Sequence, residues 1–214
     1  PGDNIGPAAV QVRPAGSRRV SALAYGGRQA GTAPPNVIYV ARDNRLWVST
    51  PSRGPGPGVN FVPRPLVERT IVPSSLSVTD IVIDPDDFDI AYAVDENNIY
   101  RTTNAGVNWT RITGSLPSIF GGYFSLEIVS VPAAGAQPAQ KVLLVGGRQG
   151  VFRTFDPAAA NVQWHEYGGT LPNVQVRDID YDTRDDRLII GTLGRGAWTL
   201  DGVINRASNN FIGR

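Results

Sequence analysis

Short apolar runs separated by turns rich in Gly and Pro dominate this sequence, and hardly any of it has helical periodicity. Four such segments align without gaps: NVIYVARDNRLWV from Asn36, DIAYAVDENNIYR from Asp89, KVLLVGGRQGVFR from Lys141 and RLIIGTLGRGAWT from Arg187. In each, an apolar strand leads through a turn into a second strand. That strand opens with an aliphatic or Ala residue and then an aromatic one: Leu46-Trp47, Ile99-Tyr100, Val151-Phe152 and Ala197-Trp198. The sequence therefore predicts four copies of one β-hairpin.

A further strand-like segment precedes each hairpin: VSALAYG from Val20, VTDIVIDP from Val78, FSLEIVSVP from Phe124 and VRDIDYDT from Val176. Short segments follow three of the hairpins: FVPRPLV from Phe61, WTRI from Trp109 and WHEY from Trp164. Repeats of roughly 40 to 50 residues with three or four strands each are typical of a β-propeller. We therefore expect an all-β propeller of about four blades. A β-sandwich has no reason to repeat an aromatic residue at one register in four successive hairpins.

The repeat divides the chain into an N-terminal segment, four blades and a C-terminal tail. The boundaries are 1–18, about 19–77, 78–122, 123–175 and 176–203, and 204–214. Two arrangements stay open. Residues 8–13 (AAVQVR) can supply a missing outer strand and close a ring of four blades, or the chain is the C-terminal part of a ring of about six to eight blades. In the second case a protein partner, or the remainder of the larger propeller, has to cover the bare sheet faces.

Composition narrows the class of protein. The chain has 214 residues and a formal net charge of +1, so one domain is the default and no nucleic-acid partner is expected. No apolar stretch approaches the roughly 20 residues of a membrane-spanning helix, so no transmembrane segment is expected. Cys and Met are absent, which excludes disulfides and thiolate chemistry and favours an extracellular, periplasmic or cell-surface location. Since residue 1 is Pro, we expect a processed or trimmed end.

The stretch RTTNAGVNWTRI at 101–112 carries a recognisable turn. Asn104 can bond backbone amides ahead of it, and Gly106 can adopt positive φ, so the two can close a tight turn between strands. Thr102 adds a hydroxyl, and Trp109 can pack over the turn as an apolar lid. These residues interrupt one strand and restart the next, and their first role is therefore structural.

This turn resembles the Asp-box, or BNR, motif, in which Ser/Thr, Asp/Asn, Gly and Trp recur at the spacing of Thr102, Asn104, Gly106 and Trp109. A second copy keeps Thr154, Asp156 and Trp164, but Ala158 replaces Gly and the Trp arrives three residues late. The resemblance, together with the hairpins across 19–203, is to the Asp-box propellers, a superfamily that includes sialidases, sortilin and xyloglucanases. It implies a propeller fold, and it implies glycoside hydrolysis as one of the activities to test.

A sialidase-like site would need three arginines that grip a substrate carboxylate. Arg148 and Arg195 fall in equivalent hairpin turns and Arg177 begins an inner strand, which makes these three the ligand-binding candidates. The alternative is that Arg148 and Arg195 are solvated at the hairpin tips. The single histidine, His165, lies on an expected outer strand, and no triad motif accompanies it.

Carboxylates are the other candidate chemistry. They gather in two runs: Asp84, Asp86, Asp87 and Asp89, and Asp178, Asp180, Asp182, Asp185 and Asp186. We expect both runs to serve turns or to line a channel, because Asp caps chain reversals well, and we assign no catalytic residue. Asp178, Asp180 and Asp182 are the candidates for a calcium site, although no D-x-D-x-D-G loop is present. Otherwise we expect no cofactor.

Three functions remain open from the sequence. The first expectation is a non-catalytic extracellular propeller that acts as a scaffold or binds a protein or polysaccharide partner. The alternatives are a carbohydrate-active propeller, sialidase-like or another glycoside hydrolase, or part of one, and a subunit or assembly factor of a larger extracellular complex. Exposed Trp or Tyr along a groove would favour sugar binding, whereas a broad apolar edge on a terminal blade would favour assembly.

Overall fold

The computed structural model describes residues 19–28, 37–42, 45–49, 67–70, 76–116, 122–133, 138–205 and 210–211. The proposed ring-closing strand at 8–13 and the segment at Phe61 lie outside these residues, apart from Val67 at its end. All elements in the described part are β-strands, and that part contains no helix long and apolar enough to cross a membrane.

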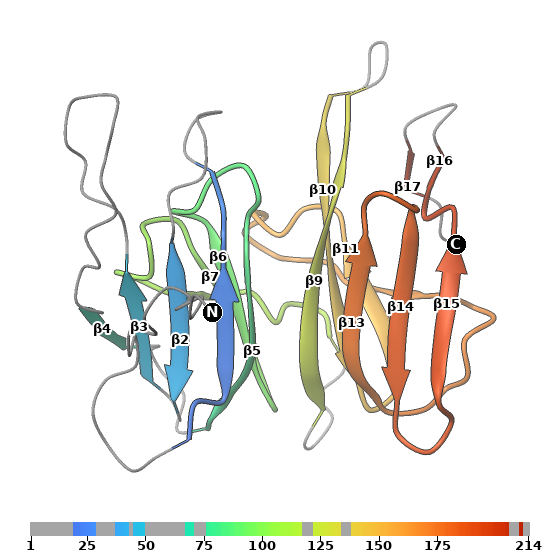
Figure 1. Ribbon diagram of the computed structural model, residues 1–214, viewed down its shortest axis with the longest axis horizontal. Coiled ribbons are helices and arrows are strands. Elements are labelled where there is room, and N and C mark those ends of the chain that lie inside the picture. The colour runs from blue at the N-terminus through green and yellow to red at the C-terminus, as the bar shows by residue number, and fades with distance from the viewer. Residues whose placement is uncertain are drawn as a thin grey trace, which may run out of the picture.

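Four antiparallel sheets follow one another along the chain, each a meander in sequence order (Figure 1). The first consists of β1 (Ala22–Tyr25), β2 (Ile38–Arg42), β3 (Arg45–Ser49) and β4 (Val67–Thr70). The second consists of β5 (Val78–Ile83), β6 (Ala91–Asp95), β7 (Ile99–Thr102) and β8 (Thr110–Arg111). The third consists of β9 (Tyr123–Val131), β10 (Gln140–Gly147), β11 (Gly150–Thr154) and β12 (His165–Tyr167). The fourth consists of β13 (Val176–Asp182), β14 (Arg187–Thr192) and β15 (Ala197–Asp201), and a separate hairpin pairs β16 (Ile204–Asn205) with β17 (Asn210–Phe211).

The first strand of each sheet contacts the first strand of the next, so β1, β5, β9 and β13 stand side by side as inner strands. The four sheets are the blades of a propeller, and the predicted all-β propeller of about four blades is confirmed. The four hairpins β2–β3, β6–β7, β10–β11 and β14–β15 fall where the aligned segments predict them.

Three apolar cores fill the spaces between consecutive blades. In the second and third blades the repeated aromatic residue packs toward the preceding blade: Tyr100 lies in the core between the first two blades and Phe152 in the next core. Trp109 and Trp164 join these same two cores. The equivalent Trp198 of the last blade is 38% exposed and belongs to none of the three cores. The buried apolar clusters of this fold therefore lie between neighbouring blades.

The turn after β7 is tied by its own side chains. The Thr102 hydroxyl oxygen accepts hydrogen bonds from the backbone N–H of Gly106 (3.0 Å) and Asn104 (3.3 Å). The Asn104 side-chain oxygen accepts one from the N–H of Asn108 (2.8 Å). Gly106 has a φ of 77°, which favours glycine. Trp109 is buried, so this turn fixes the start of β8 against the preceding blade.

The turn after β11 repeats part of this pattern. Thr154 Oγ accepts from the N–H of Asp156 (3.3 Å), and Asp156 Oδ1 accepts from the N–H of Ala158 (3.2 Å). The ring N–H of Trp164 donates to the carbonyl of Ile112 in the preceding blade (3.2 Å). The delayed Trp therefore reaches the same kind of position, between its own blade and the one before it.

Candidate functional site

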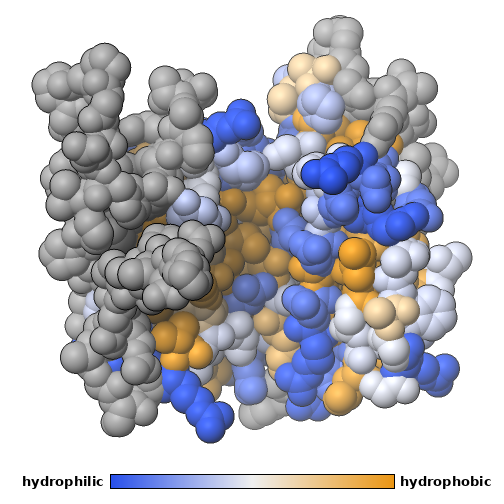
Figure 2. Space-filling view, in the orientation of Figure 1, coloured by the Kyte–Doolittle hydropathy of each residue, from blue (hydrophilic) through white to orange (hydrophobic). Residues whose placement is uncertain are grey.

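A groove of about 680 Å³ runs along the inner strands of all four blades. Figure 2 shows apolar side chains gathered in a hollow near the middle of the face that it presents. Its walls include Tyr25 on β1, Ile81 on β5, Glu127 on β9, and Asp180 and Tyr181 on β13. Tyr25 is 66% exposed, so an aromatic ring stands open at one side of the groove. The groove therefore brings together residues from four different blades.

Glu127 is the most perturbed acid of the groove. Burial raises the pKa of its carboxyl to about 7, and the negative charges of Asp180 and Asp80 add to the effect. Hydrogen bonds from backbone N–H groups act in the opposite direction: Ile128 donates to Oε1 (2.7 Å), and Tyr181 of the next blade also donates. Near neutral pH a large fraction of this carboxyl is therefore protonated, while it lines a surface open to solvent.

Asp80 lies behind the groove, on β5. Its Oδ2 accepts a hydrogen bond from the N–H of Leu126 on β9 (2.8 Å), and its Oδ1 accepts one from the N–H of Ile81 (2.7 Å). Burial raises the pKa of this carboxyl to about 6, and the charge of Asp178 contributes in the same direction. Four acids from three neighbouring inner strands thus influence one another.

Strand pairing shows which of these acids are equivalent. Glu127 pairs with Leu144 and Asp180 with Ile189, two residues that occupy the same place in their blades. Asp80 corresponds to Asp178 on the same basis, through Val94 and Gly191. Glu127 is the residue that sequence reasoning missed, and the signal was its place in the third inner-strand segment, FSLEIVSVP.

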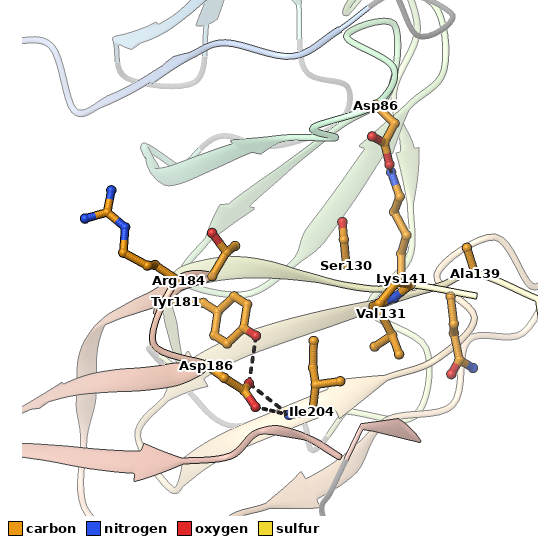
Figure 3. A pocket seen from close by; sticks show the side chains of 12 residues that line it. Asp86, Ser130, Val131, Ala139, Lys141, Tyr181, Arg184, Asp186 and Ile204 are labelled. Carbon is orange, nitrogen blue, oxygen red and sulfur yellow. Dashed lines mark hydrogen bonds and ion pairs between the residues drawn. The ribbon is translucent and has the colours of Figure 1, made fainter. Parts of the chain in front are cut away.

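A second cavity, of about 690 Å³, adjoins the groove and shares Asp86, Ser130, Tyr181 and Thr183 with it. Figure 3 shows Lys141 reaching toward Asp86, with Tyr181 and Asp186 on the other side. The Lys141 ammonium forms ion pairs with Asp84 and, at 2.8 Å, with Asp86. Because its charge is already matched by these two carboxylates, Lys141 lines this second cavity without offering a free cation.

Several members of the acid runs identified from the sequence stabilise turns or hold the C-terminal hairpin. Asp84 Oδ1 accepts from the N–H groups of Asp86 and Asp87, and Asp182 Oδ1 accepts from those of Arg184 and Asp185. These bonds lower the pKa of Asp182. The buried Asp186 accepts from the Tyr181 hydroxyl (2.8 Å) and from the N–H of Ile204 (3.0 Å), and so holds the C-terminal hairpin (Figure 3).

Asp178, Asp180 and Asp182 share one face of β13. Within the described ranges, however, no group of three or more His, Cys, Asp or Glu side chains is placed to hold a metal ion. His165 is exposed on β12, where it pairs with Arg153 in the strand register.

The three arginines proposed from the sequence do not line the groove or the cavity beside it. Arg177 stacks on the ring of Phe124, with 4.2 Å between the guanidinium carbon and the ring centroid. Arg148 and Arg195 lie in the β10–β11 and β14–β15 turns. The described residues therefore show no three-arginine grip of the sialidase kind at the groove.

No protein-family model matches the sequence. A search of curated proteins also finds no match. Among solved structures, the chain is similar to the GH74 enzyme of Niastella koreensis, with a TM-score of 0.59 and 12% identity over 91% of this chain and 30% of that one. It is also similar to an ancestral GH74 enzyme, with a TM-score of 0.57 and 16% identity over 92% of this chain and 27% of that one. The likeness shows the propeller fold, and the chain spans less than a third of either structure.

Proposed function

We propose that this chain is part of an extracellular, carbohydrate-active β-propeller of the Asp-box kind, and that its groove binds a polysaccharide. The observation that carries the proposal is the groove itself, which combines the exposed ring of Tyr25 with the carboxyl groups of Glu127 and Asp180. An open cleft with an aromatic wall and a few polar groups suits an extended sugar chain. The likeness to GH74 enzymes supports this function over a purely structural scaffold.

The two carboxyls of the groove have the properties that glycoside hydrolysis needs. Glu127, which is largely protonated near pH 7, would donate its proton to the glycosidic oxygen as the bond to the anomeric carbon breaks. Asp180 would take a proton from the water that attacks that carbon. The products are two shorter sugar chains, with Glu127 left ionised and Asp180 protonated, and exchange with solvent restores both.

A non-catalytic binding role is the second candidate, and one contact favours it. The Glu127 carboxyl also accepts a hydrogen bond from the backbone N–H of Tyr181, so it joins two blades. A group held in this way can be structural while the groove still binds sugar. Binding and hydrolysis therefore have to be measured separately.

The test is affinity electrophoresis of the chain in gels that contain xyloglucan, cellulose derivatives or other neutral glucans, beside a reducing-end assay on the same polymers. Xyloglucan is included because the Asp-box resemblance extends to xyloglucanases. Tyr25→Ala should weaken retardation at least several-fold. Glu127→Gln and Asp180→Asn should abolish hydrolysis and leave retardation largely intact, while Asp185→Asn, an exposed carboxylate outside the groove, should change neither.

Each outcome decides between the candidates. Retardation without any new reducing ends would assign a binding module and reject the hydrolytic role of Glu127 and Asp180. If no polymer of the panel retards the chain, the proposed function fails.

A further inference from the structure

A separate cavity of about 290 Å³ lies on the outer side of the propeller, away from the inner strands. It is bounded by β7 and β8 of the second blade and by residues 157–162 of the third. Its polar lining includes the side chains of Arg101, Thr103, Asn108 and Thr110, with Arg111 also contributing to the wall. No carboxylate lines this cavity, in contrast to the acidic groove.

Arg101 on β7 is one of the two arginines that line this cavity. It pairs with Tyr92 across the strand and shares the face of Tyr92, which belongs to the core between the second and third blades. The Arg101 guanidinium donates a hydrogen bond to the Tyr92 hydroxyl. Its Nε atom is buried and has no hydrogen-bond partner, and Arg101 makes no ion pair with any residue that the structure describes. A guanidinium is always charged, and a partly buried charge without a counter-charge is costly.

The equivalent arginine of the next blade shows what is missing at Arg101. Arg153 follows Phe152 in its hairpin as Arg101 follows Tyr100. The Arg153 guanidinium lies 4.5 Å from the ring centroid of Phe155 and 6.0 Å from that of Tyr167, so two aromatic faces stabilise its charge. The positions of these two rings are taken in the second blade by Thr103 and Ile112. Both of these residues line the cavity.

We infer that the cavity at Arg101 binds a small oxyanion, such as the carboxylate of a single uronic acid residue, a sulfate or a phosphate. Arg101 would supply the charge and its fork of N–H donors, and Thr103, Thr110 and Asn108 would supply neutral donors around it. The volume admits one sugar ring or one inorganic anion, not an extended chain. The site is independent of the inner groove, since the two share no residue.

The experiment is a titration of the folded chain, followed through the Arg Nε–H signals in ¹H–¹⁵N spectra, with sodium sulfate, inorganic phosphate and glucuronate as probes. Glucose is the neutral analogue of glucuronate, and NaCl keeps the ionic strength constant in every sample. We expect one Nε–H signal to shift and saturate with at least one of the three anions and not with glucose. The anion that saturates first identifies whether the site prefers a carboxylate or a tetrahedral oxyanion.

Two variants place the binding at this cavity. Arg101→Gln should abolish the saturable shift and, without anion, should not lower the unfolding midpoint, because it removes an uncompensated charge. Thr103→Phe introduces an aromatic ring at the position that Phe155 occupies in the third blade. This ring should block anion binding while the protein stays folded. The variant therefore tests the site even if Arg101→Gln does not fold. Arg195→Gln, at an exposed hairpin tip, is the matched control and should bind as the parent chain does.

The inference is overturned if none of the three anions produces a saturable shift, or if Arg101→Gln and Thr103→Phe both bind as tightly as the parent chain. Binding of glucose equal to that of glucuronate would also overturn it, since the charge would then play no part.

Discussion

The carboxylate of Asp80 on β5 accepts a hydrogen bond from the backbone N–H of Leu126 on β9, across 2.8 Å, and so joins the inner strands of two consecutive blades. One blade further on, Glu127 on β9 accepts from the backbone of Tyr181 on β13. In both cases the carboxyl of an acid on one inner strand accepts a hydrogen bond from a backbone N–H of the inner strand in the next blade. The propeller therefore uses polar bonds at its centre and apolar cores further out.

Glu127→Gln should change how stability depends on pH. The pKa of Glu127 is raised from 4.5 to about 7 in the folded chain, so the folded state keeps a proton that the unfolded state has lost. Stability of the parent chain should therefore fall as pH rises from about 4.5 to 7 and then level off, by at most about 3 kcal/mol from this residue. The neutral Gln lacks this dependence. Urea denaturation of both proteins between pH 4 and pH 8.5 measures the difference.

The decisive result is that the free energy of unfolding of Glu127→Gln rises relative to that of the parent chain as pH increases. For the control, Asp185→Asn, the difference from the parent chain should be the same at every pH. A constant difference between Glu127→Gln and the parent at all pH values would contradict the raised pKa.

Asp80→Ala and Asp80→Asn should have different effects at pH 8. Alanine leaves the buried N–H of Leu126 without its acceptor, which should cost about 1–3 kcal/mol. Asparagine keeps one acceptor oxygen for Leu126 but loses the oxygen that accepts from Ile81, and it avoids ionisation of a carboxyl whose pKa is about 6, so Asp80→Asn should lose less stability at this pH than Asp80→Ala. Chemical denaturation at pH 8 compares the three proteins, and equal losses for both substitutions would refute the role given to the acceptor.

Thr102→Ala should destabilise the second blade. The substitution removes the hydroxyl that accepts from two backbone N–H groups in the turn, one of them, that of Gly106, buried. We expect a loss of about 1–2 kcal/mol in the free energy of unfolding. Thr103→Ala, one residue along and exposed, is the control and should stay within about 0.5 kcal/mol of the parent chain. Similar losses in the free energy of unfolding for Thr102→Ala and Thr103→Ala would contradict the stabilising role given to the Thr102 hydroxyl.

Asp186→Ala should release the C-terminal hairpin. Asp186 is buried, has a φ of 53°, and bonds the Tyr181 hydroxyl and the N–H of Ile204. Alanine removes both acceptors and tolerates this φ poorly, whereas asparagine tolerates it and keeps one acceptor. Hydrogen exchange at Ile204 should therefore accelerate strongly in Asp186→Ala and only slightly in Asp186→Asn. Unchanged exchange in the Ala variant would show that other contacts hold the hairpin.

Local pattern was enough to predict the hairpins and the fold class, because apolar alternation and turn residues act within a few positions of each other. It also placed Tyr100 and Phe152 at one register, and the structure buries both between blades. The role of Glu127 depends on a strand more than 50 residues away, beyond the reach of a local pattern. A register shift between Gly146 and Gly147 adds a second difficulty, because displacement by one residue exchanges the two faces of a strand.

The candidate site was only partly visible in the sequence. Asp178 and Asp180 were identified as one face of a strand, but the exposed Tyr25 and the half-buried Glu127 join Asp180 in one groove only through the packing of separate blades. Arg148 and Arg195 were chosen because they occupy equivalent turns and Arg177 because it begins an inner strand, but such positions do not determine where a side chain points. Arg177 lies on an aromatic ring, and Arg101, which was not singled out, lines a cavity.

Three cores join the four described blades, and the two middle blades each contribute to two of these cores while the first and fourth contribute to one. In a repeat protein of this kind, each sheet is stabilised largely by its interfaces with the neighbouring sheets. In this chain by itself, the first and fourth blades should therefore open before the middle two, and the amides of β6 and β10 should exchange last. A destabilising substitution in one blade should therefore lower the stability of the adjacent blade more than that of a distant one.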